Sequence, residues 1–283
     1  MSDQKQVNNM ELVKEYLAET DSKITEQTKK TYTNISKNLD FNILTKQALI
    51  VKKLKDADRN PNTTAIYLNI VILVRRHRNE GTDKLIKYRN SLRDEIIKLR
   101  KENLKKVKDD LPTYQELEES LDKMSGLSYV INYLFLKYGV RNKDLNLLHV
   151  TKLPDKQDEN ENYLMHNKRR TSLIINDYKT DGNYGTKKIE ISDKRFNKEL
   201  KDMKLQDGSY LMPKKNGDKM KLSTFNEKIK SLSLKNLGEA KIFKVVIAHL
   251  IDKRDYNKIE ALSATRGTSL STVLKSYNVY NTE

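Results

Sequence analysis

Apolar residues recur at spacings of three and four through most of the first hundred residues, which is the period of an amphipathic helix. Tyr32, Ile35 and Leu39 show this spacing clearly. The sequence Asn-Pro-Asn-Thr at residues 60–63 interrupts the pattern, and Asn62 or Thr63 is expected to cap the helix that follows. We therefore predict a small helical domain with helices at residues 10–17, 28–39, 44–54, 64–78 and 82–108.

Residues 105–112 are charged and end at Pro112, which favours a linker between two domains. Thr113 can cap a new helix, because Glu116 lies three residues later and completes a capping box. The predicted domains are therefore residues 1–108 and residues 109–283.

The pattern changes within the second domain, where short apolar runs at residues 163–165, 172–178 and 187–191 predict strands. Asp181, Gly182, Asn183 and Gly185 are turn residues between the last two runs, which indicates a hairpin. The predicted fold class is mostly α with a small antiparallel β-sheet (α+β). A helix or turn is expected at residues 142–153, and helices at residues 128–138, 194–205, 223–231, 242–252, 256–264 and 271–277.

The chain is strongly basic, with 55 Lys and Arg against 39 Asp and Glu and a net charge of +16. Residues 1–110 hold 24 basic and 16 acidic residues, so each half carries about the same excess. Duplex DNA suits such a protein because binding releases its counterions; a solvated lysine-rich surface is the alternative. Predicted DNA contacts are the basic clusters Arg75, Arg76, Arg78 and Lys168, Arg169, Arg170.

Several classes of protein are disfavoured by composition. There is no cysteine and there are only four scattered histidines, so we expect no metal site and no cofactor. No apolar run approaches the roughly 20 residues that span a bilayer, and residues 1–9 are polar, unlike a secretory signal. We expect no membrane association and an intracellular protein, in a nucleus, a cytoplasmic viral factory or a prokaryotic cytoplasm.

One segment carries candidate chemistry. An apolar helix is expected to end at Gly139, where glycine allows a left-handed cap. Arg141 follows at the start of the next element, where backbone N–H groups also face anions, and Asp144 comes three residues later. Arg141 is thus placed either to hold a phosphate or simply to pair with Asp144. The segment resembles the first-arginine motif of the tyrosine recombinase family, which includes phage integrases and Xer-type recombinases.

That resemblance implies roles for further residues. Arg141 matches the catalytic arginine of the family, and Asp144 stands where the family has glutamate. The family's next element is a lysine in a hairpin turn that protonates the leaving 5′ oxygen. Lys179 is the best match, with Lys187 or Lys188 on the returning strand as alternatives.

The last helix matches the end of the same family pattern. Gly267, Ser269 and Tyr277 align without gaps, and the resemblance makes Tyr277 the nucleophile that forms a 3′-phosphotyrosine. Tyr280 is a second tyrosine about one helical turn further on and could compete. The resemblance implies a divergent integrase-like protein, from a large DNA virus or a mobile element.

Three positions depart from the family. Lys241 and Lys244 fall where the family has a His-x-x-Arg pair, and Thr268 falls on its last histidine. A lysine offers a point charge, whereas arginine clamps two phosphate oxygens, so the geometry of the site changes. Arg254 or Arg266 could provide the missing guanidinium, and Arg266 is also a predicted DNA contact.

The N-terminal half agrees with this resemblance, because the patterns at residues 28–32 and 62–70 are similar to the family's core-binding domain. Double-stranded DNA is then the expected partner, with self-association on DNA as a dimer or tetramer. Two functions remain open: an active recombinase that cleaves and rejoins strands without metal or cofactor, and a DNA-binding or architectural protein that keeps the fold with impaired catalysis.

Overall fold

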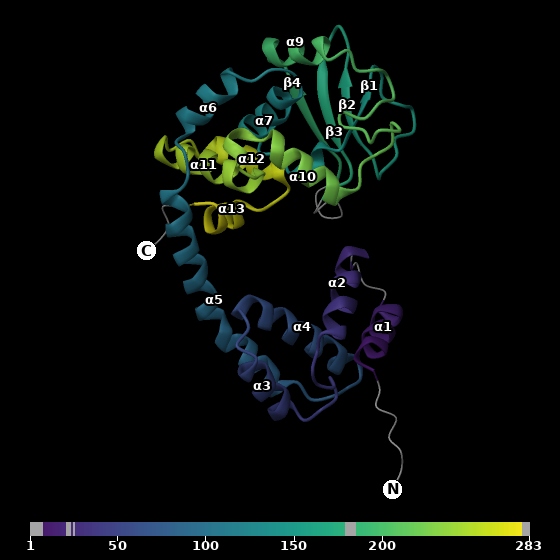
Figure 1. Cartoon of the computed structure of the whole chain (residues 1–283), viewed down its shortest axis with the longest axis vertical. Coiled ribbons are helices and arrows are strands. Elements are labelled where there is room, and N and C mark those ends of the chain that lie inside the picture. The colour runs from purple at the N-terminus through teal and green to yellow at the C-terminus, as the bar shows by residue number, and fades with distance from the viewer. Residues whose placement is uncertain (1–7, 21–23, 25, 179–184, 279–283) are drawn as a thin grey trace. The chain divides into compact units, whose positions relative to one another are not determined.

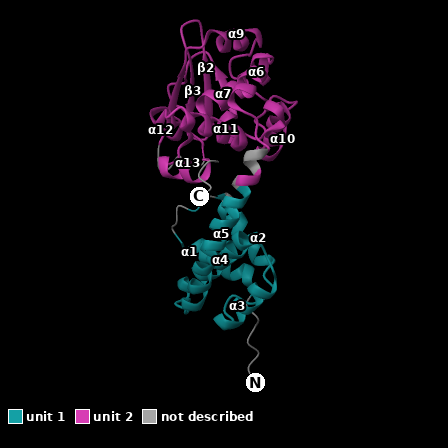
Figure 2. Ribbon diagram, turned by 90° about the vertical axis from the view of Figure 1, so that its left-hand side faces the viewer, with its two compact units in different colours: residues 1–103 teal, residues 104–283 magenta. Residues whose placement is uncertain are grey.

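The computed structural model describes residues 8–20, 24, 26–178 and 185–278. The chain divides into two compact units, Met1–Asn103 and Leu104–Glu283 (Figures 1 and 2). Unit 1 is helical, and unit 2 combines helices with a four-stranded sheet. The predicted α+β class is confirmed. None of the described helices is long and apolar enough to cross a membrane.

Unit 1 buries one apolar face of each of its helices in a single core. Leu12, Ile50, Leu68 and Leu85 come from four different helices and are almost fully buried. Because each helix has only a stripe of apolar residues, the stripe is stable only against its neighbours. The elements of this unit are α1 (Asn9–Glu19), α2 (Glu26–Lys37), α3 (Gln47–Asp56), α4 (Pro61–His77) and the first part of α5 (Asp83–Asp109).

Two details of this half differ from the prediction. The cap of α4 is Asn60, whose side chain accepts a hydrogen bond from the Asn62 backbone N–H at 2.9 Å, so neither Asn62 nor Thr63 is the cap. Pro61 then takes the first helical position, where its missing N–H costs nothing. Helix α5 continues to Asp109, so most of the predicted linker is helical; its charged residues are good helix formers until Pro112.

Unit 2 is organised around α7 (Gly126–Tyr138), whose residues from Tyr129 to Leu136 are all buried. It packs against α6, α9, α10, α11 and α12. A helix apolar on all sides must be covered on all sides, which makes α7 the centre of the unit. The predicted capping box of Thr113 and Glu116 is present at the start of α6. The other helices are α6 (Tyr114–Asp122), α9 (Lys194–Asp202), α10 (Leu222–Leu232), α11 (Glu239–Asp252), α12 (Tyr256–Arg266) and α13 (Leu270–Ser276), with short 3-10 turns η1 (Asn142–Leu145) and η2 (Leu234–Asn236).

The sheet has the order β1-β2-β3-β4 and is mixed. Strands β2 (Asn162–His166), β3 (Thr171–Ile175) and β4 (Lys187–Ile191) are antiparallel neighbours, near the predicted runs, whereas β1 (Leu147–Val150) pairs with β2 in parallel. Residues 147–150 were expected in a helix or turn, and that prediction was wrong. Their backbone bonds with β2 and with the 209–211 segment, where the Leu211 N–H donates to the Leu147 carbonyl at 2.8 Å, make them a strand.

Candidate functional site

Arg141 is positioned by the sharp end of α7. Gly139 caps the helix with a positive φ of 61°, as expected, and Arg141 lies two residues later at the start of η1. The Arg141 backbone N–H donates to Oδ2 of Asp144 at 3.0 Å. The Arg141 side chain is half-buried, and its Nη1 has no hydrogen-bond partner among the described residues. A buried cationic donor without a partner is a place where an anion would be stabilised.

Tyr277 meets Arg266 at the end of the chain. Nη2 of Arg266 lies 3.3 Å from the Tyr277 phenol oxygen, and the guanidinium carbon lies 5.1 Å from the centre of the tyrosine ring. Arg266 is 1% exposed, so this is a desolvated charge rather than a surface one. Its Nη1 donates to the Gly139 carbonyl at 2.9 Å, which ties Tyr277 to the same helix end as Arg141.

The first turn of α11 forms the other wall of this site. Glu239 accepts from Nη2 of Arg266 at 2.9 Å and from the Asn142 backbone N–H at 3.1 Å. One turn later, the Phe243 ring lies 4.3 Å from the Arg266 guanidinium carbon and packs edge-on against Tyr277, with 4.8 Å between ring centres. Residues four apart share one helix face, so Glu239 and Phe243 together hold Arg266 beside Tyr277.

The electrostatics show that the two arginines share one neighbourhood. The pKa of Arg141 is lowered by burial and then by the positive charge of Arg266, while Asp144, Tyr277 and Glu239 oppose that shift. Burial raises the pKa of the Asp144 carboxyl, and its hydrogen bond from the Arg141 backbone and the charge of Lys187 act in the opposite direction. The two guanidiniums differ: Nη1 of Arg141 has no partner among the described residues, whereas Arg266 is already bonded to Glu239, the Gly139 carbonyl and Tyr277.

Lys187 is the described hairpin lysine that reaches this cluster. Its Nζ donates to the Thr265 carbonyl at 2.9 Å, and its charge acts on Asp144. Lys188 points to an exposed ion pair with Glu190 instead. Lys179 and Tyr280, which the sequence proposed as the acid and as a second nucleophile, lie outside the described residues.

The other expected site residues occupy different places. Lys241 is exposed and Lys244 is half-buried, and burial together with the Lys241 charge lowers the pKa of Lys244. In the described part of the chain no hydrogen bond or ion pair joins either lysine to Arg141, Arg266 or Tyr277. Glu239 contacts Arg266, and Phe243 contacts both Arg266 and Tyr277. These two residues project from a different face of α11 than the two lysines do.

Arg266, rather than Arg254, is the second guanidinium that the fold brings to Tyr277. Arg254 is exposed just after α11. Thr268 is half-buried, and its backbone N–H donates to the Ser263 carbonyl at 3.0 Å, within the turn that follows α12. Arg266 is 1% exposed, so any contact that it makes with DNA would have to lie inside the cluster around Tyr277.

The predicted DNA contacts differ in whether they are buried or exposed. Arg75 is 4% exposed and donates to the backbone carbonyls of Ile43, Thr45 and Gly81, so its guanidinium stabilises unit 1 and is not offered to DNA. Arg78 is exposed and ion-paired with Glu15, and Arg76 is exposed. The three cations at residues 168–170 are exposed in the turn between β2 and β3.

One group in unit 1 has the composition of a metal site. The ligand atoms of Glu15, Glu19 and His77 lie within 4.8 Å of one another. However, Glu15 accepts two hydrogen bonds from Arg78, and His77 pairs with Glu19 at 3.1 Å. These internal pairs account for the arrangement.

Comparisons with known proteins show a distant likeness to a solved structure. No protein-family model matches the chain, and no curated protein is significantly similar to it. Among solved structures, a crystal structure of XerA recombinase is similar over 97% of this chain and 95% of that chain, with 13% sequence identity and a TM-score of 0.39.

Glu239 and Phe243 were missed by the sequence analysis. The sequence marks them only weakly. Glu239 is an acid directly after Gly238 and Phe243 is an aromatic within an apolar run, and many helices begin with such residues. Their role follows only from the packing of α11 on α12 and α13.

Proposed function

We propose that the chain binds double-stranded DNA and that Tyr277 cleaves one strand by attacking a phosphodiester. The observation that carries this proposal is the buried Arg266 guanidinium 3.3 Å from the Tyr277 phenol oxygen, beside a second guanidinium at Arg141 with an unpartnered Nη1. Two fixed cationic donors next to one nucleophile are what a phosphoryl transition state requires, because negative charge grows on its oxygens.

The step needs no external energy source. The Tyr277 oxygen forms a bond to phosphorus and loses its proton to solvent, and the bond from phosphorus to the 5′ oxygen breaks. Arg141 and Arg266 stabilise the non-bridging oxygens, and Lys187 protonates the leaving 5′ oxygen. Because the phosphotyrosine keeps the phosphate in an ester bond, attack by a 5′ hydroxyl can rejoin the strand. Lys179 is the alternative acid from the sequence.

The test is a covalent adduct. The chain is incubated with duplexes that carry a nick beside the scissile phosphate, so that the released fragment diffuses away and the adduct accumulates. A stable protein–DNA adduct is expected with the unaltered chain and not with Tyr277→Phe. The target sequence is first obtained by selecting random duplexes that the chain retains. No adduct on any retained duplex, or an equal amount with Tyr277→Phe, would overturn the proposal.

A DNA-binding protein without cleavage is the second candidate, and Glu239 favours it. The Glu239 carboxylate pairs with Arg266 and accepts from the Asn142 backbone N–H, so it already occupies two of the donors that a phosphate would use. A phosphate must displace it or bind beside it at a cost. This candidate predicts salt-sensitive DNA binding that Tyr277→Phe leaves unchanged, with no adduct.

A further inference from the structure

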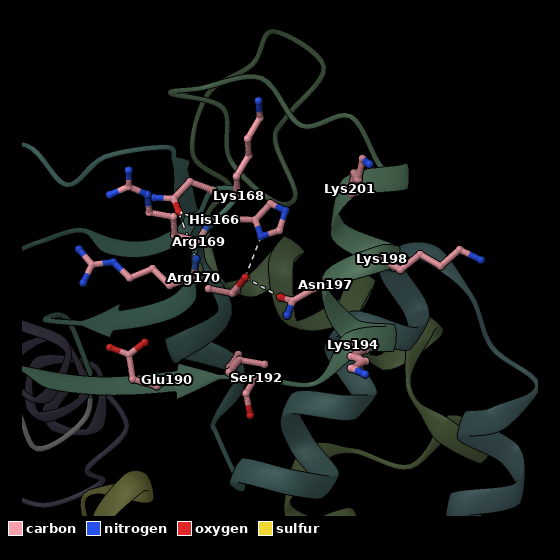
Figure 3. Close-up of a pocket in the computed structure, with 13 residues that line it drawn as sticks. His166, Lys168, Arg169, Arg170, Glu190, Ser192, Lys194, Asn197, Lys198 and Lys201 are labelled. Carbon is pink, nitrogen blue, oxygen red and sulfur yellow. Dashed lines mark hydrogen bonds between the residues drawn. The ribbon is translucent and has the colours of Figure 1, made fainter.

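A basic groove lies at one end of the sheet, between the β2–β3 turn and α9 (Figure 3). Its volume of about 990 Å³ is at the upper end of the range for sites that enclose a single ligand. Figure 3 shows His166 and Asn197 between the turn and the helix, with cations on both sides of them. Six exposed cations line the groove: Lys168, Arg169, Arg170, Lys194, Lys198 and Lys201.

The charge of these six cations is almost uncompensated. Within the described residues none of the six forms an ion pair. Glu190 is the carboxylate among the lining residues, and it pairs with Lys188 at 2.5 Å. The three lysines of α9 lie at positions i, i+4 and i+7, so they share one helix face at steps of about 6 and 4.5 Å along the axis. Like charges held this close repel one another, so an anionic ligand would be stabilised here.

Buried polar contacts fix the floor of the groove. The hydroxyl of Thr171, a residue 2% exposed, donates to Oδ1 of Asn197 at 2.5 Å and accepts from Nδ1 of His166 at 2.7 Å. These bonds join the end of β2, the start of β3 and the middle of α9. In the turn, Oδ1 of Asn167 accepts from the backbone N–H groups of both arginines at 3.0 and 3.2 Å. The two basic walls are therefore in place before a ligand binds, which lowers the entropy cost of binding.

The groove and the Tyr277 cluster lie at different ends of the sheet. Thr171 pairs with Ile191 at the groove end, and Ile175 pairs with Lys187 at the other end. Figures 1 and 2 both show α9 at the opposite end of unit 2 from α13. The five residues of β3 alone separate the two ends by about 13 Å at about 3.3 Å per residue. A phosphate beside Tyr277 therefore lies outside the groove, and only a duplex that runs along the strands would touch both places.

From the unpaired cations and the concave shape we propose that the groove binds an acidic segment of a partner protein, with several Asp or Glu residues in a short stretch. Clusters of Arg and Lys recognise acidic motifs through charge-assisted hydrogen bonds. A peptide is flexible enough to follow the groove between its walls, whereas a duplex is a stiff rod that would contact only the rims. The lining residues include no Tyr, Phe or Trp on which the bases of a single strand could stack. The inference is independent of DNA binding and of cleavage.

The spacing of the cations suits an extended acidic segment. Side chains at every second position of an extended chain point the same way and lie about 6.6 Å apart. That distance is close to the steps of about 6 and 4.5 Å between the α9 lysines. Successive acidic residues would therefore alternate between the lysines of α9 and the cations of the turn, so both walls would be used.

The test is the fluorescence anisotropy of a labelled octaglutamate peptide titrated with the full chain. An octapeptide of alternating Glu and Lys is the control peptide. The variant Lys194→Gln/Lys198→Gln/Lys201→Gln neutralises one wall, and Lys228→Gln/Lys230→Gln/Lys253→Gln removes the same charge from exposed positions outside the groove. A third variant replaces the three α9 lysines by arginine, which keeps the charge.

Saturable binding of octaglutamate is expected, with no binding of the control peptide. Loss of three exposed charge pairs should weaken binding about tenfold in the α9 glutamine variant. The control variant should lose much less, and the arginine variant should bind as the unaltered chain does. No saturable binding would overturn the proposal. An equal loss in the α9 glutamine variant and the control variant would also overturn it, because net charge alone would then explain the binding.

A competing duplex distinguishes a protein partner from DNA. The duplex has about 20 base pairs, which is long enough to run from Tyr277 along the sheet at about 3.4 Å per base pair. Octaglutamate is expected to stay bound when this duplex is added, and the α9 glutamine variant should lose no more affinity for the duplex than the control variant does. Full displacement of the peptide, or a larger loss of duplex affinity in the α9 variant, would overturn the proposal in favour of one duplex that extends into the groove. Octaglutamate binding without duplex binding would contradict the proposed function and leave this inference intact.

Discussion

Arg266 and Tyr277 face each other across the turn between two consecutive helices, with Nη2 of the arginine 3.3 Å from the phenol oxygen. Gly267 ends α12 in the left-handed region with φ of 61°, and Ser269 caps α13 by accepting from the Thr272 N–H at 3.2 Å. The turn is therefore defined by local capping. Its effect is to place a cation beside a phenol near the end of the described chain.

Arg266→Lys is expected to lower adduct formation by about 10²- to 10³-fold, the usual effect of removing one preorganised donor. Lysine keeps the charge but cannot contact Tyr277, Glu239 and the Gly139 carbonyl together. The measurement is the rate of adduct formation on a nicked duplex at saturating protein. Arg254→Lys serves as the control and should leave the rate unchanged. A rate within twofold of the unaltered protein for Arg266→Lys would exclude Arg266 from the site.

Glu239→Ala is expected to strengthen DNA binding, because the carboxylate no longer competes with phosphate for Arg266 and for the Asn142 N–H. The salt dependence of binding should also steepen by about one phosphate contact. Fluorescence anisotropy of a labelled duplex at several salt concentrations measures both effects. Glu260→Ala removes an exposed acid from α12 and is the matched control. Equal gains in the two variants would mean that Glu239 acts only through net charge.

Lys187→Gln should slow cleavage if Lys187 protonates the leaving 5′ oxygen, whereas Lys188→Gln on the same strand should not. The reason is that Lys187 donates to the Thr265 carbonyl and its charge acts on Asp144, while Lys188 pairs with Glu190 at the surface. A duplex with sulfur in place of the leaving 5′ oxygen separates chemistry from structure, because a thiolate leaves without protonation. Recovery of Lys187→Gln on that duplex is expected. An unrecovered rate would assign Lys187 a structural role.

Gly139→Ala should destabilise the protein by about 2–4 kcal/mol, combining left-handed strain with overpacking. A Cβ at Gly139 would lie 2.6 Å from the Phe243 ring, and φ there is 61°. Gly217→Ala is the control, since φ is 88° but nothing lies within 4 Å of its Cβ; it should cost about 1–2 kcal/mol. Urea unfolding of both variants measures the difference. Equal losses would show that Phe243 moves aside freely.

Asp144→Asn should alter how stability depends on pH. Burial raises the pKa of Asp144 above its ordinary 3.8, so the folded state holds this proton more tightly than the unfolded state. The resulting stabilisation is fully present below pH 3.8 and is lost as pH rises through the folded pKa. The unfolding free energy of the unaltered protein, relative to Asp144→Asn, should therefore fall as pH rises from about 4 and then level off. A difference that does not vary with pH would contradict a raised pKa.

Much of this architecture could be predicted from local patterns. The helix periods, the Thr113 and Gly139 caps and the β3–β4 pairing depend on residues close together in the chain, and all are present. Strand β1 was missed because Leu147–Val150 is short and apolar, which is compatible with either helix or strand. Its hydrogen bonds to β2 and to residues 209–211 lie far away in sequence.

Sequence patterns alone establish an α+β chain of high positive charge, with Arg141 after a glycine cap and Tyr277 after the last turn. Those features depend on spacing, which sequence displays directly. The packing of the helices shows in addition that Arg266 and Lys187 lie near Arg141 and that Arg75 is internal. It also shows that Glu239 and Phe243, rather than the expected lysines, line the inner face of α11. Charge and residue type are the same for a buried guanidinium and an exposed one; burial and the direction of a helix face arise only when the helices pack.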